Sequence, residues 1–207
     1  MREFKKWFLV ILILVLAMGW EVGLATEIKI EIKPQPTVRD CAEEFLYKVL
    51  ERILGVVPEN YYNVEIGVWL DSYHSGAFAG RGLIIITERL MSEAENEAEI
   101  AFVIAHELGH IFTNFVLGPE EKIDHIGIQL MAQVGYDVFS AVDILERIAK
   151  EQKEYKIKLE EDEIVDEKRI EIAYRNALRY SKKDQKKWIL FTPKDLEKIK
   201  EFLRNGE

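Results

Sequence analysis

The pattern His-Glu-Leu-Gly-His at residues 106–110 constrains the fold of this chain more than any other feature of the sequence. Two positions four apart on a helix lie one turn apart and on nearly the same side. The imidazoles of His106 and His110 can therefore reach one point, which is the geometry that holds a divalent metal. Apolar residues recur at helical spacing around the motif, at Ala94, Ala98, Ala101, Ala105, Leu108, Phe112 and Phe115.

Glu107 follows the first of these histidines directly and leans toward the same side of the helix. A carboxylate in this place is the residue type that takes a proton from a metal-bound water. We therefore predict Glu107 as the catalytic base and His106 and His110 as zinc ligands. The alternative is a pair of ordinary core or surface histidines. It is disfavoured because three of the four histidines of the chain fall within residues 106–125.

A catalytic zinc needs a third protein ligand and leaves its fourth position to water. A third histidine six residues after His110 is excluded, because that position is Val116. The remaining candidates stand at the start of the next expected helix, and they are Glu120, Glu121, Asp124 and His125. A carboxylate among them would complete a set of two histidines and one glutamate.

The hydrophobic pattern predicts an α+β domain, with strands early in the chain and helices late. Strands are expected at 28–32, 62–70 and 83–87. Helices are expected at 38–54, from a Ser92–Glu95 capping box through Phe115, and at about 120–133, 138–150, 166–181 and 194–204. The charged segment 150–169 is expected to be a solvated connector or an exposed helix.

Residues 1–25 have the layout of an export signal, with basic residues before an apolar run from Trp7 to Met18. The run would make ~18 Å of helix, which is short of a ~30 Å hydrocarbon core. Small residues at Gly23 and Ala25 favour cleavage before Thr26. An uncleaved anchor is the alternative, with membrane association through residues 7–20. Either reading places residues 26–207 outside the cytoplasm as one domain.

Composition narrows the remaining classes of function. The net charge of -9 argues against a general nucleic-acid surface, and 48% hydrophobic residues are enough for a core. Cys41 is the one cysteine, so neither an internal disulfide nor a cysteine-rich zinc ribbon can form. A polypeptide is the expected partner, and the oligomeric state is open.

The stretch from Phe78 to Ile148 resembles the gluzincin metallopeptidases of the HtpX-like and CAAX-protease-like group, and it is also similar to the compact minigluzincins. Three segments match in order. They are GAFAGRGLIIIT, the helix ENEAEIAFVIAHELGHIF, and EEKIDHIGIQLMAQVGYDVFSAVDILERI with its E-x-x-x-D pattern. The resemblance implies a zincin-like fold, with a small mixed sheet followed by a mostly helical part that carries the motif helix.

The resemblance also implies roles for individual residues. Glu120 corresponds to the glutamate ligand, and Asp124 to the aspartate that orients a ligand histidine, so one Zn²⁺ is expected per chain. Residues Gly76, Ala77, Phe78 and Ala79 correspond to an exposed edge that pairs with an extended peptide substrate. The chain departs from the group in two ways: only nine residues separate His110 from Glu120, and no His-Pro precedes Arg169-Ile170.

The expected function is that of an exported zinc endopeptidase that cuts unfolded or misassembled polypeptides through a metal-bound water. The donor that would stabilise the oxyanion is unassigned, with Arg169, Tyr174 and Arg175 as weak candidates. The first alternative is a catalytically inactive zinc domain that acts as a protein-binding or chaperone-like module. The second is a helical scaffold without metal.

Overall fold

The structure is a computed structural model that describes residues 38–58, 63–70, 75–80, 82–114, 119–155 and 164–181, together with 197, 198 and 201. The expected export signal at 1–25, the strand at 28–32 and most of the helix at 194–204 lie outside these residues. Among the described residues, none of the helices has the length and apolar character needed to span a membrane.

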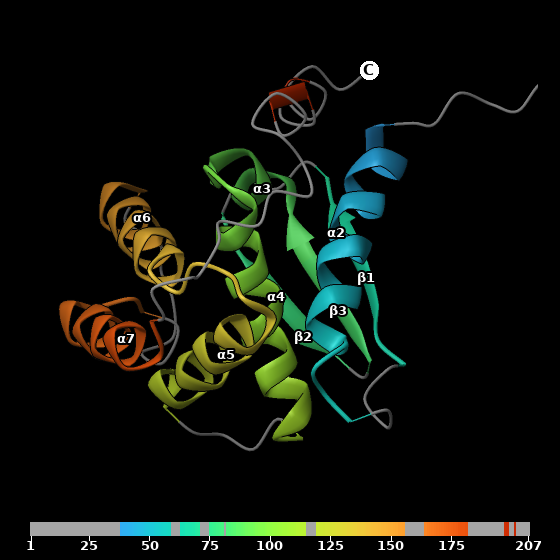
Figure 1. Ribbon diagram of the computed structural model, residues 1–207. Helices are drawn as coiled ribbons and strands as arrows, with labels where there is room; N and C mark the ends of the chain where they lie inside the picture. Colours follow the sequence, from blue (N-terminus) through green and yellow to red (C-terminus); the bar gives the residue numbers. More distant parts are fainter. Residues whose placement is uncertain are drawn as a thin grey trace, which may run out of the picture. The chain divides into compact units, whose positions relative to one another are not determined.

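A three-stranded mixed sheet forms the β part of the fold (Figure 1). Its strands are β1 (Glu65–Trp69), β2 (Ala77–Gly80) and β3 (Leu83–Thr87), in the order β1-β3-β2. β3 pairs parallel with β1 and antiparallel with β2. The prediction of a small mixed sheet near the start of an α+β domain is thus confirmed. β2 was expected only as an exposed edge segment, and it forms a short outer strand.

The rest of the described chain is helical. The helices are α2 (Val38–Leu54), α3 (Glu88–Glu93), α4 (Glu97–Phe112), α5 (Glu120–Val134), α6 (Ser140–Tyr155) and α7 (Glu167–Tyr180). Part of the charged segment 150–169 is therefore helical, because α6 continues to Tyr155 and α7 begins at Glu167. Residues 156–163 between these helices lie outside the described part.

The expected capping box of Ser92 and Glu95 is wrong. Ser92 instead lies within α3, where its hydroxyl donates to the Arg89 carbonyl. Asn96 caps α4, because its side chain accepts a hydrogen bond from the Glu99 backbone N–H at 3.1 Å. Glu99 reaches back to the backbone N–H of Glu95 at 2.8 Å. A related cap therefore occurs one turn later than the sequence pattern predicted, with the glutamate bonded to the residue before the cap and not to the cap itself.

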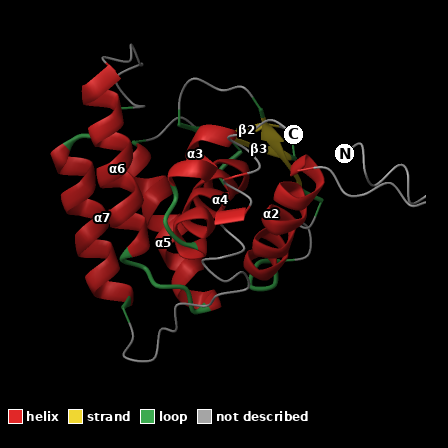
Figure 2. Ribbon diagram, turned by 90° about the horizontal axis from the view of Figure 1, so that it is seen from above, coloured by secondary structure: helices red, strands yellow, loops and turns green. Residues whose placement is uncertain are grey.

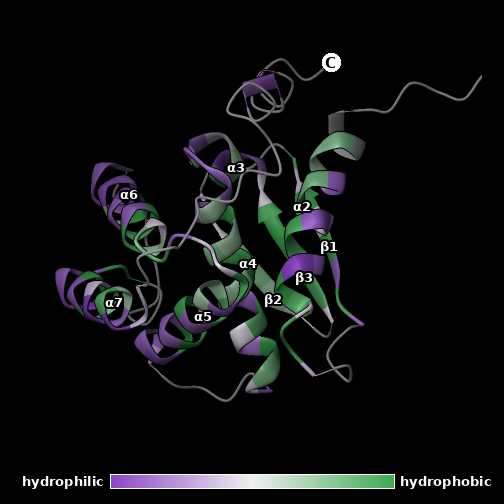
Figure 3. Ribbon diagram, in the orientation of Figure 1, coloured by the Kyte–Doolittle hydropathy of each residue, from purple (hydrophilic) through white to green (hydrophobic). Residues whose placement is uncertain are grey.

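α4 is the central helix of the domain, and it packs against α2, α5, α6 and the sheet (Figures 1 and 2). Twelve of its sixteen residues are buried, so it is enclosed on nearly every side. One face of the sheet packs against this core through four buried side chains, which are Ile66, Val68, Ile84 and Ile86. Figure 3 shows β3 as hydrophobic, in keeping with its place between the other two strands.

Two glycines let α4 and α5 approach closely. A Cβ on Gly127 of α5 would lie 3.2 Å from the His106 backbone nitrogen, and a Cβ on Gly109 of α4 would lie 3.0 Å from the Ile123 side chain. At distances this short, a Cβ at either position would force the neighbouring atoms to move by a few tenths of an ångström. The close spacing of the two helices therefore depends on glycine at both positions, which flank the turn of α4 that carries His106.

This contact predicts that Gly127→Val destabilises the domain. The new side chain would press on the His106 backbone, which cannot yield as a flexible side chain could, so we expect a loss of about 2 kcal/mol in the free energy of unfolding. Gly80→Val is the matched control, since a Cβ there meets nothing within 4 Å. The control should stay within about 0.5 kcal/mol of wild type in urea unfolding. Equal stability of the two variants would contradict the close approach.

Candidate metal centre

His106 and His110 lie one turn apart on α4, and their Nε2 atoms are 3.2 Å apart. The ring planes stand at 75° with centroids 4.9 Å apart, so the rings converge on a point without stacking. The His106 side chain is 11% exposed and the His110 side chain 26% exposed. The pair therefore lies at the boundary between the core and the solvent, where a ligand can reach both nitrogens.

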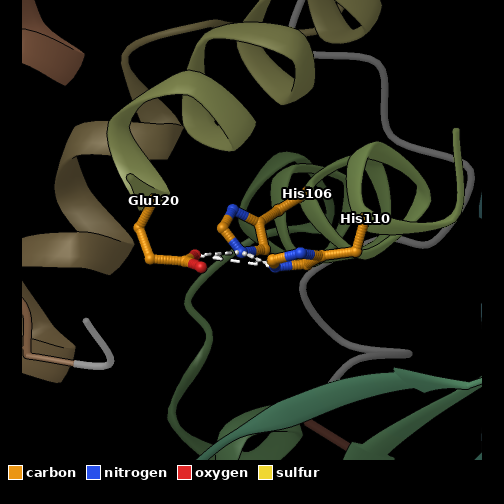
Figure 4. Close-up of side chains that lie close together, drawn as sticks. All are labelled: His106, His110 and Glu120. Carbon is orange, nitrogen blue, oxygen red and sulfur yellow. Dashed lines mark hydrogen bonds and ion pairs between the residues drawn. The ribbon is translucent and has the colours of Figure 1, made fainter. Parts of the chain in front are cut away.

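Glu120 faces this pair from the first turn of α5 (Figure 4). Its Oε2 atom lies 3.0 Å from His106 Nε2 and 3.6 Å from His110 Nε2. The short connection of nine residues is sufficient because α4 ends at Phe112 and α5 begins directly after Pro119. The position that the resemblance assigned as the third ligand is therefore the one that the fold brings to the two histidines.

The three ligand atoms form a triangle that fits a tetrahedral zinc site. Ligands ~2.0–2.1 Å from zinc at tetrahedral angles lie about 3.3 Å from one another. The observed edges are 3.0, 3.2 and 3.6 Å, which bracket that value. Among the described residues, this is the cluster of histidine, cysteine and acidic side chains that could hold a metal. Two imidazoles and a carboxylate are donors that suit zinc.

Asp124 orients the first histidine from one turn further along α5. Its Oδ1 atom lies 2.9 Å from His106 Nδ1, so the ring donates there and keeps Nε2 directed at Glu120. Asp124 is 1% exposed, and an isolated carboxylate so deeply buried would be costly. Arg169 of α7 offsets this cost with hydrogen bonds of 2.7 Å from Nε and 2.9 Å from Nη2 to the two carboxylate oxygens.

The pKa values of His106 and Glu120 follow from these contacts. Burial of His106 opposes its charge, but the hydrogen bonds to Asp124 and Glu120 outweigh that effect and raise its pKa to about 9. Burial of Glu120 favours its neutral form, yet the hydrogen bonds to both histidines hold its pKa far below the usual range. The protonated His106 ring thus donates one hydrogen bond to each of these two carboxylates.

Glu107 is buried beside the triangle and faces β2. Desolvation raises the pKa of its carboxyl group, although the neighbouring His106 and His110 lower it. The Ala79 backbone N–H donates a hydrogen bond to this carboxylate. The side chain predicted as the base therefore stands between the two histidines and the sheet edge predicted to bind the substrate.

The predicted substrate edge, residues 76–79, lies at and along β2 on the outer side of the sheet. The Gly76 carbonyl accepts a hydrogen bond from the Thr87 backbone N–H at 2.9 Å. Because antiparallel strands alternate the direction of their backbone groups, Ala77 and Ala79 direct theirs away from β3. The Ala79 contact with Glu107 agrees with this alternation.

The other acidic and histidine candidates point elsewhere. Glu121 accepts a hydrogen bond from Lys168 at 3.0 Å, on the exposed side of α5. His125 Nδ1 lies 3.0 Å from Asn176 Oδ1, and its Nε2 lies 3.3 Å from the Tyr180 hydroxyl. Both residues therefore link α5 to α7, and neither belongs to the histidine–glutamate triangle.

None of the three oxyanion candidates has a free cationic or hydroxyl group at the triangle. Arg169 is committed to Asp124, and its Nη2 also lies 3.5 Å from Glu120 Oε2. Tyr174 is 47% exposed and packs on Phe139, and Arg175 pairs with Glu171 on the surface. The structural role of Arg169 was missed, because helical periodicity in α7 does not reveal which side chain meets a carboxylate on another helix.

The buried pair of Arg169 and Asp124 predicts that Arg169→Met lowers the free energy of unfolding by about 3 kcal/mol. The loss follows because the substitution leaves the Asp124 carboxylate buried without either of its guanidinium bonds. Lys168→Met is the matched control, since Lys168 is 71% exposed and pairs only with Glu121 at the surface. Its effect should stay within about 0.5 kcal/mol in urea unfolding. A similar loss in both variants would refute the buried role of Arg169.

Part of this site lies in a segment that is similar to a known protein family. The model of peptidase family M48 matches residues 46–117, which contain the second half of α2, the sheet, α3 and α4 with its histidines. No curated protein matches the chain. The resemblance inferred from the sequence is thus confirmed, because residues 46–117 match peptidase family M48, consistent with the HtpX-like gluzincin metallopeptidases.

Proposed function

We propose that this protein is an exported zinc-dependent metalloendopeptidase that hydrolyses peptide bonds in unfolded or misassembled polypeptides. The observation that carries the proposal is the triangle of His106, His110 and Glu120, with edges of 3.0 to 3.6 Å beside the buried Glu107. The match to an M48 peptidase model supports peptidase chemistry at this place.

Zn²⁺ held by His106, His110 and Glu120 would activate a water molecule and polarise the scissile carbonyl. Glu107 takes the proton of the attacking water and passes it to the leaving amine. Its burial suits this role, because desolvation makes a carboxylate a stronger base at neutral pH. Asp124 holds the His106 ring in the tautomer that directs Nε2 to the metal, and Arg169 keeps that aspartate ionised.

The edge strand β2 supports an extended polypeptide as the substrate. The Ala77 backbone groups and the Ala79 carbonyl face its outer side and can pair with a peptide main chain, which gives affinity with little dependence on sequence. A folded protein rarely offers a free extended segment to an outside strand. The peptide bond nearest Ala79 would lie close to Glu107, which contacts the N–H of that residue.

The proposal of export rests on residues 1–25, whose basic start and apolar run are typical of an export signal. An exported domain would act outside the cytoplasm. In the uncleaved form, residues 7–20 would hold the domain at a membrane. The negative net charge favours a protein substrate over a nucleic acid.

An inactive zinc domain that binds other proteins is the second candidate. It is favoured by one observation: the cationic candidate closest to the triangle, Arg169, already bonds both oxygens of Asp124. This domain would keep the metal site and the β2 edge but would not hydrolyse peptides. Zinc binding and peptide hydrolysis must therefore be measured separately.

Zinc content tests the ligand set. The purified wild-type chain should hold about one zinc, and Glu120→Ala should retain well under half of that after dialysis, because two imidazoles alone bind zinc weakly. Glu121→Ala is the matched control from the next position, since that carboxylate faces Lys168. Metal analysis by mass spectrometry gives both values. Full zinc content in Glu120→Ala would remove Glu120 from the site.

Proteolysis tests the base. Glu107→Gln should bind zinc as wild type does, because the substitution leaves the three ligands intact, and it should cut denatured casein about 10²–10⁴-fold more slowly. Glu95→Gln, at a side chain that is 75% exposed, should cut casein normally. A chelator should abolish the wild-type activity. Equal casein cleavage by Glu107→Gln would reject the mechanism, while zinc binding without cleavage in wild type would favour the binding module.

A further inference from the structure

α2 and α4 pack on one face of the sheet (Figure 2), and the opposite, outer face carries three exposed apolar side chains. Trp69 of β1 is 54% exposed, Phe78 of β2 is 45% exposed and Leu83 of β3 is 41% exposed. The strand register places all three on the outer face, because the buried Val68 and Ile84 alternate with them toward the core. Parallel strands usually have both faces covered. β1 and β3 are parallel, yet their outer face is open to solvent at these residues.

Trp69 and Phe78 join these side chains into one surface across the sheet. Their ring centroids lie 5.8 Å apart with an interplanar angle of 86°, which is an edge-to-face contact. The contact passes over β3, because β3 lies between the strands that carry the two rings. The Ile85 side chain of β3 is on the same face, since its Cδ1 atom lies 3.5 Å from the position of a Cβ on Gly67. The rings therefore form an apolar surface over the middle of the sheet and do not point outward from the β2 edge.

The outer face also has few of the charged side chains that a water-facing sheet carries. Among the outward positions of the three described strands, Glu65 at the start of β1 is the one ionisable residue. It is in register with Leu83, at the end of β1 away from Trp69. An apolar surface of this kind is typical of a site that contacts a partner or a membrane.

The size of this surface decides between a protein partner and a membrane. Three partly exposed apolar side chains offer about 300 Å² of contact area, since a buried aromatic side chain covers about 150–250 Å². A stable protein–protein interface needs about 800 Å² from each partner. A second copy of the chain would therefore bind weakly through this face. A lipid bilayer needs no matching shape, and tryptophan is enriched at its interface with water.

The N-terminal part of the chain supplies a reason for the domain to be near a bilayer. In the uncleaved form, the apolar run from Trp7 to Met18 would tether the domain to a membrane. Residues 19–37 connect this run to α2 and span at most about 65 Å when fully extended. The run is short of the hydrocarbon thickness, and a weak anchor gains much from a second contact on the same chain. Linked contacts act at a high effective concentration, so a small apolar face is sufficient.

We infer that the outer sheet face docks on the surface of a lipid bilayer through Trp69, Phe78 and Leu83. In this orientation the sheet lies along the membrane, and α4 with the histidine–glutamate triangle lies on the side turned away from it. The β2 edge then runs parallel to the membrane surface, where extended segments of polypeptides that lie along the bilayer can reach it. The docking itself does not require the proposed peptidase activity.

The test measures whether Trp69 touches lipid in the full-length protein. Trp7, Trp20 and Trp188 are replaced by Phe, so that Trp69 is the one tryptophan left of four. The protein is bound to phosphatidylcholine vesicles with brominated acyl chains, which quench tryptophans that contact the bilayer. Trp69 emission should fall about twofold relative to unbrominated vesicles, because the ring would lie at the interface.

Matched substitutions test the face itself. Leu83→Glu adds a charge to the outer face, four residues along β3 from the partner of Trp69, and should remove about half of the quenching or more. Leu178→Glu is the control, because Leu178 is 51% exposed on α7, which packs on α5 and α6. Its quenching should be unchanged. Thermal melting shows that each variant is folded, and Leu83→Gln is the milder substitution if Leu83→Glu lowers the melting temperature.

A second control moves the tryptophan to the other side of the domain. Tyr47 is 41% exposed on α2, which packs on the face of the sheet opposite to Trp69. Trp69→Phe combined with Tyr47→Trp should therefore show no quenching by the brominated lipid. Quenching at this position in place of Trp69 would mean that α2 faces the bilayer, and the inference would be wrong.

The outcomes separate this inference from the proposed function. If a variant that keeps only Trp7 is quenched while Trp69 is not, the tether is in the bilayer and the outer face does not touch lipid, which overturns the inference. A dimer in sedimentation that Leu83→Glu dissolves, without quenching of Trp69, would assign the face to a second copy and also overturn it. Casein cleavage without quenching removes the docking and leaves the peptidase intact. Quenching without cleavage supports the docking and counts against the peptidase.

Discussion

The close crossing of α4 and α5 is the constraint on which the metal centre depends. Gly127 of α5 lies against the backbone of His106. Gly109 of α4 lies against Ile123, which precedes Gly127 by one turn of α5. With the helices this near, the first turn of α5 reaches the imidazoles of α4, and Glu120 can approach both Nε2 atoms. Larger side chains at these glycines would press α5 away from α4 and so displace the Glu120 carboxylate from the two imidazoles.

Charge balance explains why several ionisable groups can be buried together here. Asp124 and Glu120 bring two negative charges, which are countered by Arg169 and by the proton on His106. Each buried carboxylate oxygen of Asp124 has a donor, so burial does not leave an unpaired group. A divalent cation would replace the proton and add charge of the same sign, so the surrounding network is already arranged for a metal.

The sequence predicted those parts of the site that follow from local geometry. The positions of His106, His110 and the start of α5 could be predicted because helical spacing is visible among neighbouring residues. Asn96 as the cap of α4 was missed, because Ser92 offers an equally good local pattern and only the tertiary contacts of α3 decide between them. Arg169 was not predictable as a partner of Asp124, since 45 residues separate them.

The candidate metal centre extends beyond residues 46–117, the segment that the peptidase family model matches. Residues 46–117 supply two imidazoles, Glu107 and the sheet, but Glu120 and Asp124 belong to α5, which follows that segment. Burial raises the pKa of the Asp124 carboxyl, but hydrogen bonds from His106 and from the Arg169 guanidinium on α7 outweigh that effect and lower it. The His-Glu-x-x-His helix and the sheet are therefore only part of the candidate site. In this chain, the helices that complete the site come from sequence with no match to the family model.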